Sequence, residues 1–263
     1  MPRFKLTIEY AGTRYSGWQI QKNARTVQGE IDRAVRTVSG RADFELYGSG
    51  RTDAGVHASA QIAHLDVATA LPPAALRQRL NDELPPDINI LAAAVVPHRF
   101  HARHDAVARR YVYQIARRRT AFAKPYVWWV KEAIDVTRMR VAGRALVGMR
   151  DFKSFAEADD EAVGDRSTLV LLERLDVAED GALVLVVIEG SHFLWKMVRR
   201  IVGVLVEIGR GGLEADAAAD LLARGDRAAP ARLTAPASGL FLERVFYRTD
   251  RRDTEVHALT PCR

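Results

Sequence analysis

The segment Phe4-Lys5-Leu6-Thr7-Ile8-Glu9-Tyr10 alternates apolar and polar side chains, which is the period of a strand with one buried face. Thr26 is a typical N-cap, and the apolar residues after it follow a helical period as far as Gly40. Strand patterns at 44–47 and 61–67, a helix opened by Pro72 and an apolar strand at 88–96 complete this half. The first half is therefore predicted to run β-α-β-β-α-β.

The composition changes between residues 97 and 110, where histidine and arginine replace most apolar residues. We interpret this stretch as a connection and divide the chain into domains 1–104 and 105–263. The second half contains strand patterns at 111–116, 126–130, 168–177, 182–188 and 240–247, and helix patterns at 135–148, 193–208 and 213–222. The polar tail after Arg248 is expected to be frayed.

The order of elements predicts an α+β fold of two pseudo-symmetric halves. Each half is expected to be a split β-α-β unit of the ferredoxin or RRM type, with an antiparallel sheet and helices on one side. The natural place for an active site is then a cleft between the halves.

The charge balance favours a polyanionic partner. The 263 residues include 39 Lys and Arg against 33 Asp and Glu, a formal charge of +6 with a pI near 9.7. Cys262 is the only cysteine, which excludes a disulfide framework and fits a reducing cytoplasm. We expect a soluble, unanchored protein, because the segment Met1-Pro2-Arg3-Phe4-Lys5-Leu6 carries charges where a signal peptide needs an apolar core. The longest apolar runs are also far shorter than the roughly 20 residues that span a membrane.

The polar stretch Gly48-Ser49-Gly50-Arg51-Thr52-Asp53-Ala54-Gly55-Val56-His57-Ala58 carries the strongest chemical signal. It places one carboxylate, Asp53, two residues from the guanidinium of Arg51, among glycines that allow a ligand to approach the backbone. Because the stretch contains no second acid, it indicates a nucleophile rather than an acid and base pair.

The part of this stretch from Gly50 to Ala58 resembles the signature of the tRNA pseudouridine synthase A family. The resemblance covers residues 4–247. Five further segments agree with that family in the same order: Tyr10-Ala11-Gly12-Thr13-Arg14-Tyr15-Ser16-Gly17-Trp18-Gln19, Phe100-His101-Ala102-Arg103, Arg109-Arg110-Tyr111-Val112-Tyr113, Met197-Val198-Arg199-Arg200-Ile201-Val202-Gly203 and Ala235-Pro236-Ala237-Ser238-Gly239-Leu240.

The resemblance implies a homodimer that isomerises uridine to pseudouridine at positions 38, 39 and 40 of the tRNA anticodon stem-loop, without cofactor or metal. Asp53 matches the family's nucleophile, a role that suits a carboxylate because it is also an adequate leaving group. Arg199 matches the arginine that pairs with this aspartate, and Arg51 the one that extrudes the target nucleotide. Tyr111 matches the tyrosine whose ring contacts uracil, and base stacking of this kind is worth about 1 to 3 kcal/mol.

Three further residues are candidates for substrate binding: His57, Arg103 and Arg110. We expect His57 to hydrogen-bond the active loop and the arginines to contact phosphates, which gives position and affinity rather than base readout. His57, His64, His101 and His104 show no zinc-binding spacing. Tyr113, which follows Tyr111 at strand period, is expected to be a core residue.

Three alternatives remain open. A nucleoside hydrolase also attacks C1′ with a carboxylate but usually needs a second one, about 5 to 10 Å away. A non-catalytic RNA-binding protein has no use for an acid in its cleft. A related pseudouridine synthase with a different target uridine is the most serious alternative. The acidic loop 156–164 and the tail 249–263 have no assigned role.

Overall fold

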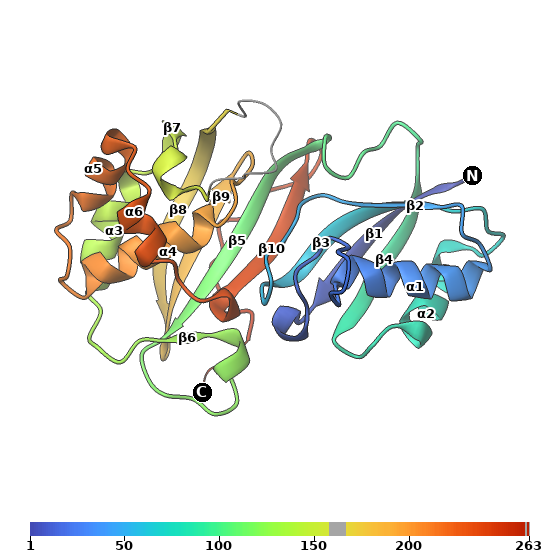
Figure 1. Cartoon of the computed structure of the whole chain (residues 1–263), viewed down its shortest axis with the longest axis horizontal. Helices are drawn as coiled ribbons and strands as arrows, with labels where there is room; N and C mark the ends of the chain where they lie inside the picture. Colours follow the sequence, from blue (N-terminus) through green and yellow to red (C-terminus); the bar gives the residue numbers. More distant parts are fainter. Residues whose placement is uncertain (158–166, 261, 263) are drawn as a thin grey trace. The chain divides into compact units, whose positions relative to one another are not determined.

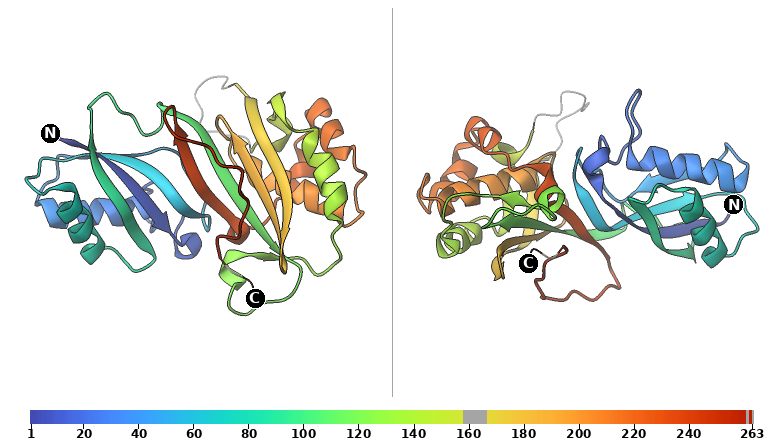
Figure 2. Two further views of the ribbon diagram at one scale, coloured as in Figure 1. Left: turned by 180° about the vertical axis from the view of Figure 1, so that it is seen from behind. Right: turned by 90° about the horizontal axis from the view of Figure 1, so that it is seen from below.

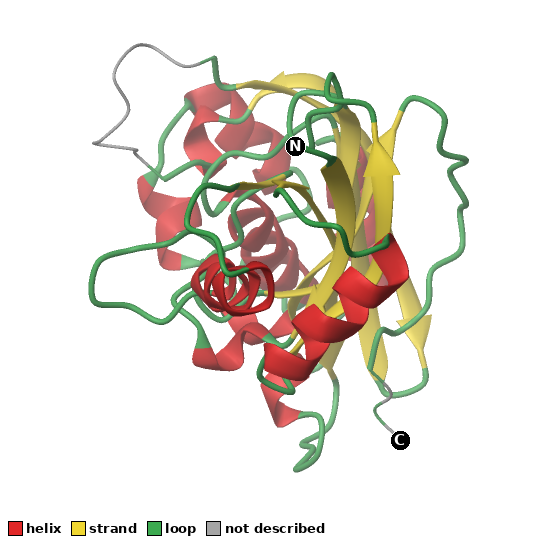
Figure 3. Ribbon diagram, turned by 90° about the vertical axis from the view of Figure 1, so that its right-hand side faces the viewer, coloured by secondary structure: helices red, strands yellow, loops and turns green. Residues whose placement is uncertain are grey.

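The computed structural model describes residues 1–157, 167–260 and 262. Within them it contains six α-helices and ten strands, most of them antiparallel to their neighbours (Figure 1, Figure 3). The predicted mixed α+β class is confirmed. Contacts divide the chain into unit 1, residues 1–107 and 241–252, and unit 2, residues 108–240 and 253–263.

Unit 1 contains two helices and four strands of the N-terminal half. They are β1 (Arg3–Tyr10), α1 (Val27–Ser39), β2 (Glu45–Gly48), β3 (His57–Asp66), α2 (Pro73–Glu83) and β4 (Ile88–Val96). The strand order is β4-β1-β3-β2, and all three pairings are antiparallel. The C-terminal strand β10 (Leu240–Tyr247) adds a short parallel pairing to the start of β3. The predicted boundary after residue 104 does not include residues 241–252, which belong to unit 1 although they lie near the end of the chain.

The core of unit 1 follows the predicted periodicity. Every second residue of β1, from Phe4 to Tyr10, is buried, as are the apolar residues of α1. The Thr26 hydroxyl accepts a hydrogen bond from the Gly29 N–H, and Gly40 ends α1 with φ of 67°. Both helix signals read from the sequence are confirmed.

Unit 2 has a sheet in the order β5-β9-β8-β7, antiparallel throughout. Its elements are β5 (Ala106–Ala116), β6 (Trp128–Trp129), α3 (Val136–Arg144), β7 (Gly148–Asp151), β8 (Leu169–Asp180), β9 (Leu183–Gly190), α4 (Met197–Gly209), α5 (Ala217–Arg224) and α6 (Ala228–Arg232). β5 begins in unit 1, and the two-residue strand β6 pairs with its end in parallel. The strand predicted at 126–130 is therefore short, because Pro125 lies in a 3₁₀ turn over Lys124–Tyr126.

The expectation of a frayed C-terminal tail is wrong for the residues that the structure describes. The Arg110 guanidinium binds the Asp253 carboxylate, and the N–H groups of Leu259 and Thr260 donate to the buried Gln114 amide oxygen. Figure 2 shows the tail on the face of the unit 2 sheet opposite its helices. The acidic loop assigned to 156–164 lies mostly outside the described residues.

Candidate active site

The loop between β2 and β3 presents Asp53 on a tight turn. The Val56 N–H donates to the Asp53 carbonyl at 3.1 Å, and Gly55, third in the turn, has φ of 79°. This positive φ is the requirement of a type II turn, which glycine meets without strain. Asp53 is half-buried there and Arg51 is exposed.

A second segment, residues 10–18, holds this loop from both sides of Asp53. The Trp18 N–H donates to the Thr52 carbonyl at 3.1 Å, and the Gly55 N–H donates to the Tyr15 carbonyl at 3.2 Å. The Tyr10 and Thr52 hydroxyls, both buried, share a hydrogen bond of 2.8 Å. The backbone on either side of the carboxylate is therefore tied to a part of the chain about 40 residues away.

Glycines allow this close approach. A Cβ added to Gly12 would lie 1.9 Å from the Val56 carbonyl oxygen, and one added to Gly17 would lie 2.6 Å from the Thr52 carbonyl oxygen. Gly48 packs against the Trp18 indole, where an added Cβ would come within 2.6 Å. Side chains at these positions would displace the loop that carries Asp53.

His57 lies beneath the loop rather than on its surface. The side chain is 1% exposed, its ring stacks on Phe241 at 4.7 Å, and its Nδ1 accepts a hydrogen bond from the Gly12 N–H at 3.1 Å. The acceptor role leaves Nδ1 without a proton. This burial speaks against the substrate contact predicted for His57, and we assign the residue to holding the turn at Gly12.

Arg103 is exposed in the segment after β4, as a phosphate contact requires. Nearby, His101 packs against His64 and His104 with ring centroids 4.8 and 4.2 Å apart. Burial lowers the pKa of His64 to about 4, and burial together with His104 lowers the pKa of His101. With a lowered pKa, His101 does not add to the cationic surface around Arg103.

Tyr111 lies on β5 and is half-buried, with its ring edge-on to Phe193 at 5.1 Å. Tyr113, two residues further along the same face of the strand, is fully buried and donates its hydroxyl to the Pro236 carbonyl at 2.7 Å. Burial raises the pKa of the Tyr113 phenol, against the effect of the Arg199 guanidinium. The core role predicted for Tyr113 is confirmed.

Arg199 stands in the first turn of α4, half-buried, and is tied to the segment that begins at Ala235. Its Nε donates to the Ala235 carbonyl at 2.8 Å, and the Ala235 N–H donates back to the Arg199 carbonyl at 3.1 Å. Gly203, one helical turn later, lets this segment approach, because an added Cβ would lie 1.6 Å from the Leu233 carbonyl oxygen. Arg199 therefore belongs to the same side of the unit 2 sheet as Tyr111 and Tyr113.

The N-terminal end of α4 carries more cations than acids. Its first turn, which the structure describes in full, holds Arg199 and Arg200 and no acidic residue, and Lys196 precedes it. Arg200 and Lys196 both pair with Glu157. Since a helix N-terminus itself favours anions, the surroundings of Arg199 suit a carboxylate or a phosphate.

Arg110 does not fit the substrate-binding role that we predicted for it. It is 2% exposed, and its guanidinium binds the buried Glu189 carboxylate at 2.8 Å and the Asp253 carboxylate at 2.7 Å. Alternate residues of a strand face opposite sides of the sheet, so Arg110 faces away from Tyr111. We assign it to the packing of the C-terminal tail.

The candidate residues thus fall into two sets. Arg51, Asp53, His57 and Arg103 lie in unit 1, and Arg110, Tyr111 and Arg199 lie in unit 2. The sequence had pointed to the segments 10–19 and 235–240 by resemblance alone, without a role for their residues. The structure gives them one, since Tyr10, Gly12, Gly17 and Ala235 hold the backbone around Asp53 and Arg199.

Among the described residues, no group of three His, Cys, Asp or Glu side chains is arranged to hold a metal ion. The helices of the described part are all too short or too polar to cross a membrane.

Comparison with known proteins places these residues in a family. The profile of the tRNA pseudouridine synthase family matches residues 6–105 and 142–248. The chain is 43% identical over 250 residues to tRNA pseudouridine synthase A of Rhodopseudomonas palustris (strain BisA53) and of Nitrobacter hamburgensis, covering 94% of this chain and 100% of each relative. It is 42% identical over 249 residues to the enzyme of the same name from Geotalea uraniireducens, with the same coverage. The chain belongs to the tRNA pseudouridine synthase family.

Proposed function

We propose that this protein isomerises uridine to pseudouridine at positions 38, 39 and 40 of the tRNA anticodon stem-loop, with Asp53 as the nucleophile. The observation that carries the proposal is the Asp53 turn, which offers a half-buried carboxylate on backbone held from both sides. Such rigidity is what a reacting group needs, because displacement of about 1 Å can cost on the order of 100-fold in rate.

The reaction requires no net exchange with solvent. The bond from C1′ to N1 of uracil breaks, a bond from C1′ to C5 forms, the hydrogen on C5 leaves and N1 gains a proton. A single carboxylate can hold the intermediate and then depart, since it attacks when ionised and leaves readily. That accounts for one acid in the loop where a hydrolase uses two.

The remaining roles follow from position and charge. Arg199 is proposed as the cation that keeps Asp53 ionised, a role supported by the positive N-terminal end of α4. Arg51, exposed next to the turn, is proposed to take the place of the extruded uridine, and base extrusion costs a few kcal/mol that such a side chain offsets. Tyr111 is proposed to contact the uracil ring, and Arg103 a phosphate.

The broader setting is proposed on the same basis. We infer that the enzyme works as a cytoplasmic homodimer without a cofactor and that its two units are pseudo-symmetric split β-α-β halves with the site between them. The strand order β4-β1-β3-β2 of unit 1, with antiparallel neighbours, supports the split arrangement for that unit. A related synthase with another target uridine is the alternative that the experiment below also tests.

The experiment is to map pseudouridine in a tRNA transcript treated with wild-type protein, Asp53→Asn or Asp82→Asn. Asp82 is an exposed acid of α2 in the same unit and serves as the matched control. Asp53→Asn is expected to lower the rate by on the order of 1,000-fold or more while tRNA binding persists, because removal of a nucleophile abolishes the chemical step. Asp82→Asn is expected to behave as wild type.

Substantial pseudouridine formation by Asp53→Asn would contradict the nucleophile assignment. Release of free uracil by the wild-type protein would favour a hydrolase, and modification outside positions 38 to 40 would favour the alternative synthase.

A further inference from the structure

The segment that connects β5 to α3 contains a concentration of cations and aromatic rings that the proposed chemistry leaves unused. We call residues 117–131, with the sequence Arg-Arg-Arg-Thr-Ala-Phe-Ala-Lys-Pro-Tyr-Val-Trp-Trp-Val-Lys, the basic aromatic loop. It has five cations and no Asp or Glu. Arg117 pairs with Glu179 at 2.7 Å. The other four cations give the loop a positive surface.

The loop is held in a defined conformation. Ala123 and Val127 are buried in a small apolar cluster with Ala116, Leu183 and Leu185, against which part of the C-terminal tail packs. Hydrogen bonds anchor its backbone at two places: the Val130 N–H donates to the Ala116 carbonyl at 3.1 Å, and the Gln114 side chain donates to the Tyr126 carbonyl at 2.9 Å. The backbone that carries the side chains at its tip is therefore held in place.

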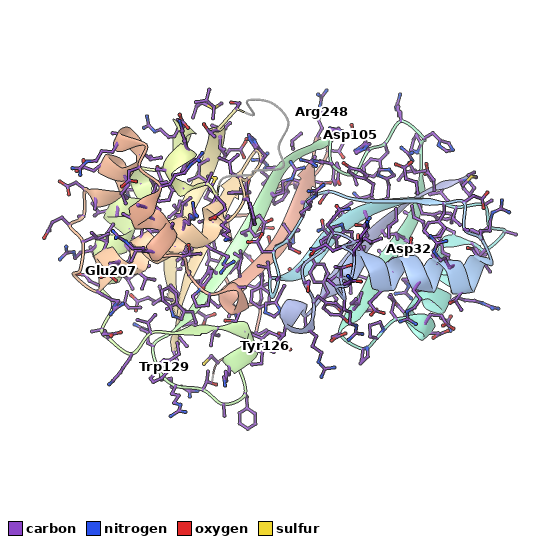
Figure 4. The ribbon with its side chains drawn as sticks, in the orientation of Figure 1. Asp32, Asp105, Tyr126, Trp129, Glu207 and Arg248 are labelled. Atoms are coloured by element: carbon purple, nitrogen blue, oxygen red, sulfur yellow. The ribbon has the colours of Figure 1, made fainter. Side chains whose placement is uncertain are left out.

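Phe122 is 97% exposed, the highest value among the exposed large hydrophobic residues of the described chain. Its neighbour Ala123 is buried, so the anchored backbone turns this ring outward. Trp129, labelled with Tyr126 in Figure 4, is 42% exposed, and the Arg119 guanidinium lies 5.8 Å from its ring. Exposed aromatic rings with cations around them are the combination of side chains that binds unpaired nucleic-acid bases.

We propose that the basic aromatic loop is a second contact for the tRNA substrate, in which Phe122 stacks on a base outside the helical stack while Arg118, Arg119 and Lys124 bind phosphates. The inference rests on the proposed function for the identity of the RNA. Tyr111 and Ala116 are five residues apart on β5, which puts the root of the loop about 17 Å along the strand from Tyr111. The stacked base is therefore not the target uridine but another nucleotide of the same tRNA.

Charge complementarity favours RNA over a protein partner. Protein interfaces are depleted in lysine and need roughly 1,000 Å² or more of surface, far beyond one phenylalanine and part of a tryptophan. A loop with five cations and no Asp or Glu of its own matches a phosphate backbone. An aromatic face accepts any base because every base has a π face.

The test measures the equilibrium dissociation constant of an unmodified full-length tRNA transcript for wild-type protein, Phe122→Ala and Phe122→Trp. Phe122→Ala is expected to weaken binding by about five-fold or more, since one stacked base contributes at least about that factor. Phe122→Trp keeps an aromatic ring and is expected to bind as wild type. The control is Met149→Ala on β7 of the same unit, which removes a 59% exposed apolar side chain and is expected to bind as wild type.

Two further measurements examine the phosphates and the stacked base. Log affinity falls as log salt rises, and each phosphate contact contributes about 0.7 to 0.9 to the steepness of that fall. The combined variant Arg118→Gln, Arg119→Gln and Lys124→Gln is therefore expected to make the fall less steep by about 2. A photo-crosslinking benzoylphenylalanine at position 122 is expected to react with one nucleotide other than the target uridine.

Equal tRNA affinity of wild-type protein and Phe122→Ala would overturn the proposal. So would a crosslink at the target uridine, or a change in the sedimentation of RNA-free Phe122→Ala without a change in tRNA affinity, which would make the loop an interface between copies. These outcomes are separate from the proposed function, because binding is measured without turnover. A wild-type protein that forms no pseudouridine on the same transcript would refute the function and leave the binding measurement standing.

Discussion

The contact between residues 10–18 and the Asp53 loop can be tested with a graded series of glycine to alanine substitutions in unit 1. A Cβ at Gly17 would lie 2.6 Å from the Thr52 carbonyl oxygen, and one at Gly12 would lie 1.9 Å from the Val56 carbonyl oxygen. Gly40, at the end of α1, meets nothing within 4 Å. Gly17 and Gly40 both have positive φ, 93° and 67°, so they share a backbone penalty and differ in the contact.

The magnitudes follow from these distances. Real Cβ atoms stay at least 3.0 Å from such an oxygen, so Gly17→Ala must move the Thr52 carbonyl by about 0.4 Å and Gly12→Ala must move the Val56 carbonyl by about 1.1 Å. Since a displacement of about 1 Å can cost on the order of 100-fold in rate, we expect a loss of about ten-fold for Gly17→Ala and about 100-fold for Gly12→Ala. Gly40→Ala is expected to cost about 1 to 2 kcal/mol of stability for its left-handed φ and to keep the wild-type rate.

The assay is single-turnover pseudouridine formation with enzyme in excess over tRNA, together with urea unfolding of each variant. Excess enzyme removes differences in tRNA affinity, and the unfolding curves show whether the variants are folded under assay conditions. Equal rate losses for Gly17→Ala and Gly40→Ala would refute the reasoning, because the rate would then follow stability rather than the position of the loop.

Two predictions concern stability. Arg110→Ala should lower the free energy of unfolding by about 3 to 5 kcal/mol, because it removes the cation that binds the buried Glu189 carboxylate. Arg109 is a half-buried neighbour on the same strand, and Arg109→Ala should cost about 1 kcal/mol. Similar urea midpoints for the two variants would contradict this prediction. The pKa of buried His64 is about 4 when folded and about 6.5 when unfolded, so the unfolded chain takes up the proton first and stability falls from pH 6.5 to pH 4 by roughly 3 kcal/mol. His64→Asn, which keeps an acceptor for the Ala102 N–H, should lose that part of the pH dependence, and an unchanged pH profile would show that the histidine does not titrate as stated.

The sequence predicted those features that depend on local chemistry. The alternation from Phe4 to Tyr10 and the capping signals at Thr26 and Gly40 operate within a few residues, and the structure has them all. By contrast, the tail after Arg248 contains few apolar residues, and its fixed course depends on hydrogen bonds to Gln114 and Arg110, more than 140 residues away. No pattern within the tail reveals such partners.

The arginine pair Arg109-Arg110 shows the same limit within the candidate site. Strand period requires that the two side chains face opposite sides of the sheet, so at most one can lie on the face of Tyr111. Which one is buried depends on Glu189 in β9 and Asp253 in the tail. A cation count along the sequence treats the two residues as equal, although Arg110 is buried and Arg109 is only half-buried.

Asp53 in unit 1 and Arg199 in unit 2 are held in position in the same way. Asp53 is held by residues 10–18, and Arg199 by the residues around Ala235; in each case a glycine, Gly17 or Gly203, lets carbonyl backbone approach where a Cβ would collide. Neither holding segment carries a nucleophile, a base or a cation that the proposed reaction uses. Their backbone holds Asp53 and Arg199, the groups that the proposed reaction uses. An active site needs its groups held within about 0.5 Å, and backbone contacts hold them more precisely than a mobile loop does. This explains why a family signature extends over segments with no reactive group of their own.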